Sequence, residues 1–263
     1  SSTKTYDLGA RVILASTHKI YESVQAANIG KDPSTQAAWW SVVRPTNKWA
    51  VFDLSNSTKT ITNGGDSPKI TYEIRASSID SVAVLNINEA TSVTVTMTSS
   101  DGDVVYTKNV SLLGIPYNSD WWSWFFGERT LRPTQVILSG LPLYVNAIIK
   151  IELEGSSELS AATIIIGRSK RIGVGVLTGA RVGIQDYSRK EKTDYGDTIL
   201  VERAFARRVS FNVLISAIEV DTSVNYLAGI RAKPCLWISG SYESASAFGF
   251  YKTFDILIQY STH

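Results

Sequence analysis

The sequence predicts an all-β protein built from packed antiparallel sheets. Apolar or β-branched side chains alternate with polar ones in the runs 91–100, TSVTVTMTSS, and 147–155, AIIKIELEG. This period of two is typical of strands that are buried on one face, and few stretches of the chain show a helical period. Because a half-buried strand needs a second sheet to cover it, we expect β-sandwiches. Turn-forming residues separate the predicted strands at 63–68, 99–103, 117–120 and 153–157.

Two interruptions of this pattern predict three modules. Pro45 breaks the first section shortly after the tryptophan pair in WWSVVRPTNKW. A basic, glycine-flanked stretch, GRSKRIG, follows the strand-like TIIIG. We therefore expect a small module at 1–44, a sandwich at 45–167 and a second β-rich domain at 168–263.

The composition favours a protein that binds over one that catalyses. Hydrophobic residues make up 44% of the chain, charged residues 19%, and the net charge is +2, so nothing calls for a polyanionic partner such as nucleic acid. Two histidines, His18 and His263, and one cysteine, Cys235, leave little material for a metal centre or for acid–base chemistry near neutral pH. We expect no enzyme activity, no metal and no cofactor. No run reaches the ~20 apolar residues of a membrane helix and the start lacks the apolar core of a signal peptide, so we expect no membrane insertion and synthesis in a cytoplasm.

The first module has a recognisable order of aromatic and turn residues. Its features are Tyr6, Gly9, Val12, Tyr21, Pro33 and the pair Trp39 and Trp40. This order resembles the small chitin-binding modules that are attached to polysaccharide hydrolases. In those modules sugar-stacking rings follow the second tyrosine, but the corresponding stretch here, 22–27, has no ring. The alternatives are a sugar-binding module and a structural hairpin that docks to a neighbour.

The second module begins with PTNKWAVFDLSNSTKT, residues 45–60, and looks like the galactose-binding-like jelly roll of lectin-type domains. Together with DWWSWFF, LSGLPLYVNAIIKIEL and FGFYKTFDILI, its opening resembles a family of tail-associated structural proteins of tailed bacteriophages. The resemblance extends over nearly the whole chain. It implies a structural protein of a phage tail tip or baseplate, located in the virion and made in the host bacterial cytoplasm. Its partners would be other tail or baseplate proteins, and the third module would anchor it to the tail.

The stretch DWWSWFFGER, residues 120–129, places five aromatic rings in six consecutive positions. In a strand these rings would occupy both faces, and a sandwich core covers only one of them. The second face would pack within the chain, contact another copy in a symmetric homo-oligomer, or bind a host cell-surface glycan, as in a lectin-like receptor-recognition protein. A pair of carboxylates such as Asp120 and Glu128 would be the starting point for a glycosidase, the third class of function. The candidate contact residues are Asp120, Trp121, Trp122, Trp124, Phe126 and Arg129.

The third module contains a charge-rich segment, Arg189 to Asp197, between strand-like runs. Its charges alternate in sign, which predicts a solvated loop or an assembly contact. A phosphate clamp could be formed by Arg203, Arg207 and Arg208 together with Arg168, Lys170 and Arg171, but the near-neutral chain argues against nucleic acid. The glycine-rich run 173–183 lacks the lysine of a phosphate-binding loop.

Overall fold

The structure is a computed structural model. It describes residues 3–53, 55, 58–62, 68–113, 121, 133–192, 195–203, 205–240 and 246–249. Strands dominate and every described strand pair is antiparallel, which confirms the all-β prediction. The narrower assignment to a jelly roll stays a prediction. The chain divides into two compact units, Ser1–Ser169 and Lys170–His263.

The first unit begins with a small module that holds few apolar residues and relies on aromatic rings. Trp40 and Tyr21 are buried, and the Tyr6 and Trp40 rings meet edge to face with centroids 5.3 Å apart. Gly9 has a positive φ of 81°, as the turn between the first two strands requires. The strands pair in the orders β2-β3-β5 and β1-β4. Their bounds are β1 Thr5–Tyr6, β2 Arg11–Leu14, β3 Lys19–Ser23, β4 Asn28–Ile29 and β5 Trp40–Pro45.

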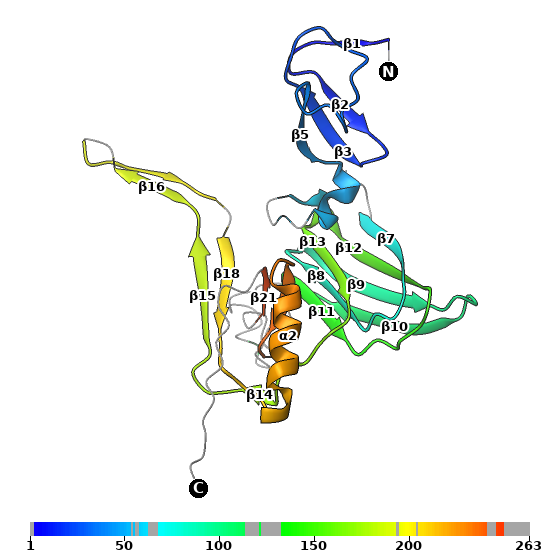
Figure 1. Cartoon of the computed structure of the whole chain (residues 1–263), viewed down its shortest axis with the longest axis vertical. Helices are drawn as coiled ribbons and strands as arrows, with labels where there is room; N and C mark the ends of the chain where they lie inside the picture. The colour runs from blue at the N-terminus through cyan, green and yellow to red at the C-terminus, as the bar shows by residue number, and fades with distance from the viewer. Residues whose placement is uncertain are drawn as a thin grey trace. The chain divides into compact units, whose positions relative to one another are not determined.

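A β-sandwich forms the rest of the first unit (Figure 1). One sheet has the strand order β10-β9-β12-β6, with β7 also paired to β12, and the other has the order β11-β8-β13. Both sheets contribute to one apolar core, in which Val93, Val95 and Met97 of β9 lie opposite Val82 and Val84 of β8 as members of the same cluster. The elements are η1 Asn47–Phe52, β6 Thr60–Ile61, β7 Lys69–Ala76, β8 Ser81–Leu85, β9 Asn88–Thr98, β10 Val104–Ser111, β11 Gln135–Ser139, β12 Ala147–Ala161 and β13 Thr163–Gly167.

The alternation that predicted strands at 91–100 and 147–155 appears directly in the burial of β9 and β12. Val93, Val95 and Met97 are fully buried, whereas Thr94 and Thr96 between them are partly exposed. Side chains on a strand point to opposite faces in turn, so β9 faces the core with its apolar residues and the outside with its threonines.

The end of the first unit is fixed by a carboxylate. Asp80 lies just before β8, and its two oxygens accept hydrogen bonds from the Ser169 backbone N–H (2.7 Å) and hydroxyl (3.0 Å). Burial works to raise the pKa of Asp80, but the hydrogen bonds from Ser169 and Ser81 and the charge of Arg168 outweigh it and lower the pKa below its ordinary value. The chain therefore leaves the sandwich at a defined point.

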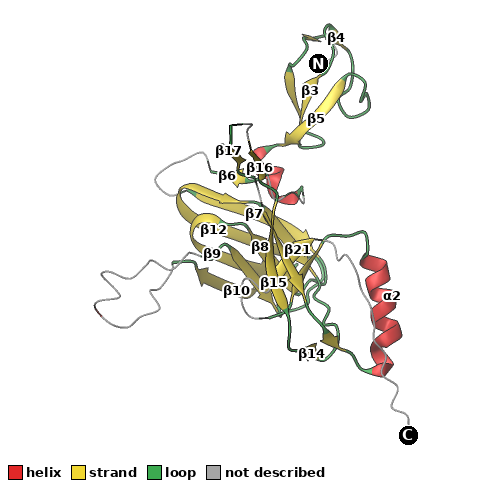
Figure 2. Ribbon diagram, turned by 90° about the vertical axis from the view of Figure 1, so that its left-hand side faces the viewer, coloured by secondary structure: helices red, strands yellow, loops and turns green. Residues whose placement is uncertain are grey.

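The described part of the second unit consists of two-stranded pairs, the 3-10 helix η2 Ala217–Glu219 and the α-helix α2 Val220–Ile230, which is drawn in red in Figure 2. The strand-like pattern of the sequence predicts few helices and none in this region. Ser223 and Leu227 are four residues apart and buried, so α2 owes its place to one packed face. The other elements are β14 Gly175–Val176, β15 Arg181–Asp186, β16 Arg189–Lys192, β17 Thr198–Val201, β18 Phe205–Ser210, β19 Val213–Leu214, β20 Cys235–Ile238 and β21 Ser246–Gly249.

Candidate interaction surface

The aromatic stretch that the sequence singled out is described at one position. Trp121 is 79% exposed, so the solvent reaches most of its indole. The other candidate contact residues, Asp120, Trp122, Trp124, Phe126 and Arg129, lie outside the described residues, as does Glu128. What covers them stays a prediction.

A long β-ribbon in the second unit is the most unusual described surface. The ribbon is made of β15 paired with β18 and of β16 paired with β17, and Figure 1 shows β16 continuing beyond β15. Every residue of β15, β16 and β17 is exposed. Two strands alone are marginally stable in water, and among the described elements β21 contacts this ribbon along β18, whose Ala206, Arg207 and Val209 are partly buried. A solvated loop was one of the two predictions for the segment from Arg189 to Asp197. In the structure this segment contributes β16 to a strand pair.

The two faces of the ribbon differ in chemistry. Cross-strand neighbours share a face, and the register pairs Val182 with Val209, Ile184 with Arg207 and Asp186 with Phe205. These six residues form what we call the Ile184 face. The opposite face, which we call the Gln185 face, carries Arg181, Gly183, Gln185, Ala206, Arg208 and Ser210.

The Ile184 face exposes large apolar side chains beside charged ones. Ile184 is 72% exposed, and Val182 and Phe205 are also exposed. A shallow hollow of about 380 Å³ extends this face towards the ribbon's end. It is lined by Ile184, Asp186, Ser188, Lys190, Leu200, Glu202, Arg203 and Phe205.

Asp186 organises the charges of this face. Its Oδ1 accepts a hydrogen bond from the Ser188 backbone N–H at 2.9 Å, and its Oδ2 lies 3.1 Å from Lys190 Nζ. The hydrogen bonds from the Ser188 side chain and backbone, followed by the one from Lys190, hold the pKa of Asp186 at about 2. The Ser188 hydroxyl in turn accepts a hydrogen bond from the Arg203 backbone N–H at 3.1 Å. This last bond joins the two strands of the ribbon between the β15–β18 and β16–β17 pairs.

Three of the arginines considered as a phosphate clamp do not share one face. Arg207 lies opposite Ile184 and Arg208 lies opposite Gly183, so they project from opposite sides of β18. Arg203 lies beyond β18, at the hollow. The ribbon therefore places Arg203 and Arg207 on the Ile184 side and Arg208 on the opposite side.

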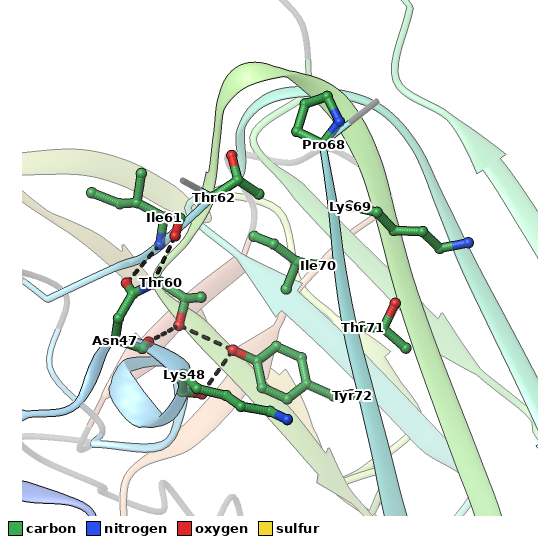
Figure 3. A pocket seen from close by; sticks show the side chains of 10 residues that line it. All are labelled: Asn47, Lys48, Thr60, Ile61, Thr62, Pro68, Lys69, Ile70, Thr71 and Tyr72. Atoms are coloured by element: carbon green, nitrogen blue, oxygen red, sulfur yellow. Dashed lines mark hydrogen bonds between the residues drawn. The ribbon is translucent and has the colours of Figure 1, made fainter. Parts of the chain in front are cut away.

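A second hollow, of about 440 Å³, lies on the sandwich between η1, β6 and β7. Figure 3 shows Tyr72 pointing from β7 towards η1. The Tyr72 hydroxyl donates to the Lys48 carbonyl oxygen at 2.8 Å and lies 3.0 Å from Thr60 Oγ1, which donates to the Asn47 carbonyl oxygen at 2.6 Å. Burial raises the pKa of Tyr72 above its ordinary value. These polar groups are hydrogen-bonded to one another. We therefore interpret the hollow as the place where η1 is hydrogen-bonded to the sheet.

The remaining candidates for chemistry are metal ligands and the single thiol. Within the part of the chain that the structure describes, no group of three or more His, Cys, Asp or Glu side chains could hold a metal ion, and no helix is long and apolar enough to cross a membrane. Cys235 lies in β20 and is partly exposed. Burial raises the pKa of its thiol, against the smaller opposing effect of Lys233, which disfavours the reactive thiolate.

Comparison with known proteins gives no relative from which to transfer a function, because no family model, curated protein or solved structure matches the chain.

Proposed function

We propose that the chain is a structural subunit of a multi-copy assembly, namely the tail tip or baseplate of a bacteriophage. The ribbon is the observation that carries this proposal. A protein that works alone in water gains nothing from a two-stranded extension that exposes Ile184, Leu200 and Phe205. A subunit of an assembly gains an element that reaches a neighbour and becomes covered there.

The resemblance of the sequence to tail-associated phage proteins supplies the kind of assembly. On this proposal the second unit contacts other tail or baseplate proteins, and the first unit, with its sandwich and aromatic module, faces outwards. The work of the protein is binding, and it needs no cofactor.

The test is whether the protein is part of the particle. Antibodies raised against the purified chain should label one end of the tails of phage particles from the source culture, seen by immunogold electron microscopy. Cryo-electron microscopy of the same particles should show the ribbon covered by protein. A chain that is made in infected cells but absent from purified particles rejects the proposal.

A second candidate function is recognition of a host cell-surface glycan, and the exposure of Trp121 favours it. Exposed indoles stack on the apolar faces of sugar rings, and repeated copies turn weak single sites into firm attachment. A glycan array probed with the wild-type chain and with Trp121→Ala tests this function. Tyr195→Ala is the matched control, because Tyr195 is 95% exposed and lies in the second unit. Binding that survives Trp121→Ala, or no binding at all, rejects a site at this indole.

A further inference from the structure

We propose that the Ile184 face is an interface between two copies of this chain, packed face to face around a two-fold axis. This inference rests on the proposed function, because it names the partner of the ribbon within the assembly. Its basis is the order of apolar and charged residues on the ribbon.

Two neighbouring rungs of the ribbon complement each other. One rung holds Ile184 and Arg207, and the next holds Asp186 and Phe205. Each rung therefore has one apolar and one charged side chain, and the two charges have opposite signs. A two-fold axis perpendicular to the strands and passing between these rungs lays each rung over the other one of the second copy. Across this axis Ile184 of each copy lies over Asp186 of the other, and Arg207 lies over Phe205. Each Asp186 is then one strand spacing, about 5 Å, to the side of the other copy's Arg207, and each Ile184 is displaced in the same way from the other copy's Phe205.

The charge balance of the Ile184 face fits a copy of itself better than a partner of one sign. Together with the hollow, this face carries Lys190, Arg203 and Arg207 as cations and Asp186 and Glu202 as anions. A strongly acidic partner would meet the two carboxylates, and a basic one would meet the three cations. A second copy offers both signs in the inverted order.

The Gln185 face lacks these properties. Its charged residues are Arg181 and Arg208, and it carries no acidic residue. Two such faces would bring like charges together and would bury little apolar surface, since the remaining residues include Gly183 and Ala206. The same ribbon thus has one face suited to self-association and one that opposes it.

Sedimentation velocity over a range of protein concentrations tests the interface in solution. The wild-type chain should self-associate, and Ile184→Lys should weaken the association constant about tenfold or more, as expected when a central apolar contact is replaced by a charge. Ile13→Lys is the matched control, because Ile13 is a 66% exposed isoleucine in β2 of the first unit. It should associate like the wild type. A wild-type chain that stays monomeric at every concentration overturns the inference, as does equal weakening by both variants.

Cysteine cross-linking tests the face itself and does not depend on a disruptive substitution. The chain has one cysteine, so Cys235→Ser gives a thiol-free background. In that background a short bis-maleimide cross-linker should join Ile184→Cys into a covalent dimer, because the two thiols lie on facing sheets about two residues apart along the strand, and it should not join Gln185→Cys, one residue away on the opposite face. Equal cross-linking at both positions overturns the inference. A monomeric chain that is nevertheless found in phage particles overturns this inference alone and leaves the proposed function standing.

Discussion

The imidazole of His18 stacks on the indole of Trp49, with ring centroids 4.0 Å apart and planes 15° from parallel. The ring of Trp49 also contacts the ring of Phe52, with centroids 5.7 Å apart. Phe52 in turn packs edge to face against Tyr72 of the sandwich, with centroids 5.4 Å apart. The turn between β2 and β3 is therefore joined to the sandwich through a row of rings. The Thr46 backbone N–H also donates to the His18 carbonyl oxygen at 2.8 Å.

Trp49→Ala should lower the free energy of unfolding of the chain by about 2 kcal/mol, since it removes two ring contacts that contribute about 1 kcal/mol each. Urea denaturation followed by circular dichroism measures the change. Trp49→Phe keeps a flat ring in the row and should lose about half as much. An unchanged urea midpoint in Trp49→Ala would show that the row adds nothing to stability.

Tyr72 should make the sandwich sensitive to alkali. Burial raises its pKa in the folded state above the value of 10.0 that it has when exposed. Its stabilising contribution is therefore complete below pH 10 and is lost as the pH rises through the folded pKa, because the unfolded chain releases the proton first. The urea midpoint should fall between pH 9 and pH 11 by more in the wild type than in Tyr72→Phe. At pH 8 the variant should be less stable by about 1 kcal/mol, because the Lys48 carbonyl oxygen loses its donor. Parallel pH curves for the two proteins would contradict this assignment.

The carboxyl group of Asp186 should titrate far below an ordinary aspartate. Its pKa of about 2 follows mainly from the hydrogen bonds of Ser188 and then from Lys190. Their stabilising effect is present above the ordinary value of 3.8 and disappears as the pH falls through about 2. Carbon NMR of the carboxyl group should give a midpoint near 2. Ser188→Ala should raise this midpoint more than Lys190→Met does, and the reverse order would show that charge dominates.

Gly155→Ala should destabilise the sandwich strongly. Gly155 lies where the register of β12 and β9 shifts, and a Cβ atom there would overlap the backbone carbonyl oxygen of Glu89. Since backbone atoms on a paired strand cannot move aside, we expect a loss of about 3 kcal/mol in unfolding free energy, as is typical of a forced backbone shift. Gly167→Ala is the matched control, because a Cβ at Gly167 has no neighbouring atom within 4 Å. Thermal unfolding of both variants measures the difference, and equal melting temperatures would refute the steric account.

The sandwich could be predicted from the sequence because the alternation of apolar and polar residues within each strand determines which side chains face the core. Alternation placed Val95 in the core and Thr94 outside, and both positions agree with the structure. The helix α2 could not be predicted in this way, since its sequence VDTSVNYLAGI begins with β-branched residues and its helical state depends on packing around Leu227.

The sequence predicted only part of the interaction surface. The alternating charges from Arg189 to Asp197 left a solvated loop and an assembly contact as alternatives. The decisive property, that no described second sheet covers β15, β16 and β17, depends on residues distant in the chain, which periodicity does not report. The dense aromatic rings at 121–126 are conspicuous in the sequence, whereas Ile184 and Phe205 stand in ordinary strand sequences.

The two hydrogen bonds from Ser169 to Asp80 determine where a pulling force on the chain first acts on the sandwich. Tension applied through the second unit enters the sandwich at Ser169, immediately after β13. The two hydrogen bonds to Asp80 carry this load before it reaches the ladder that joins β13 to β8.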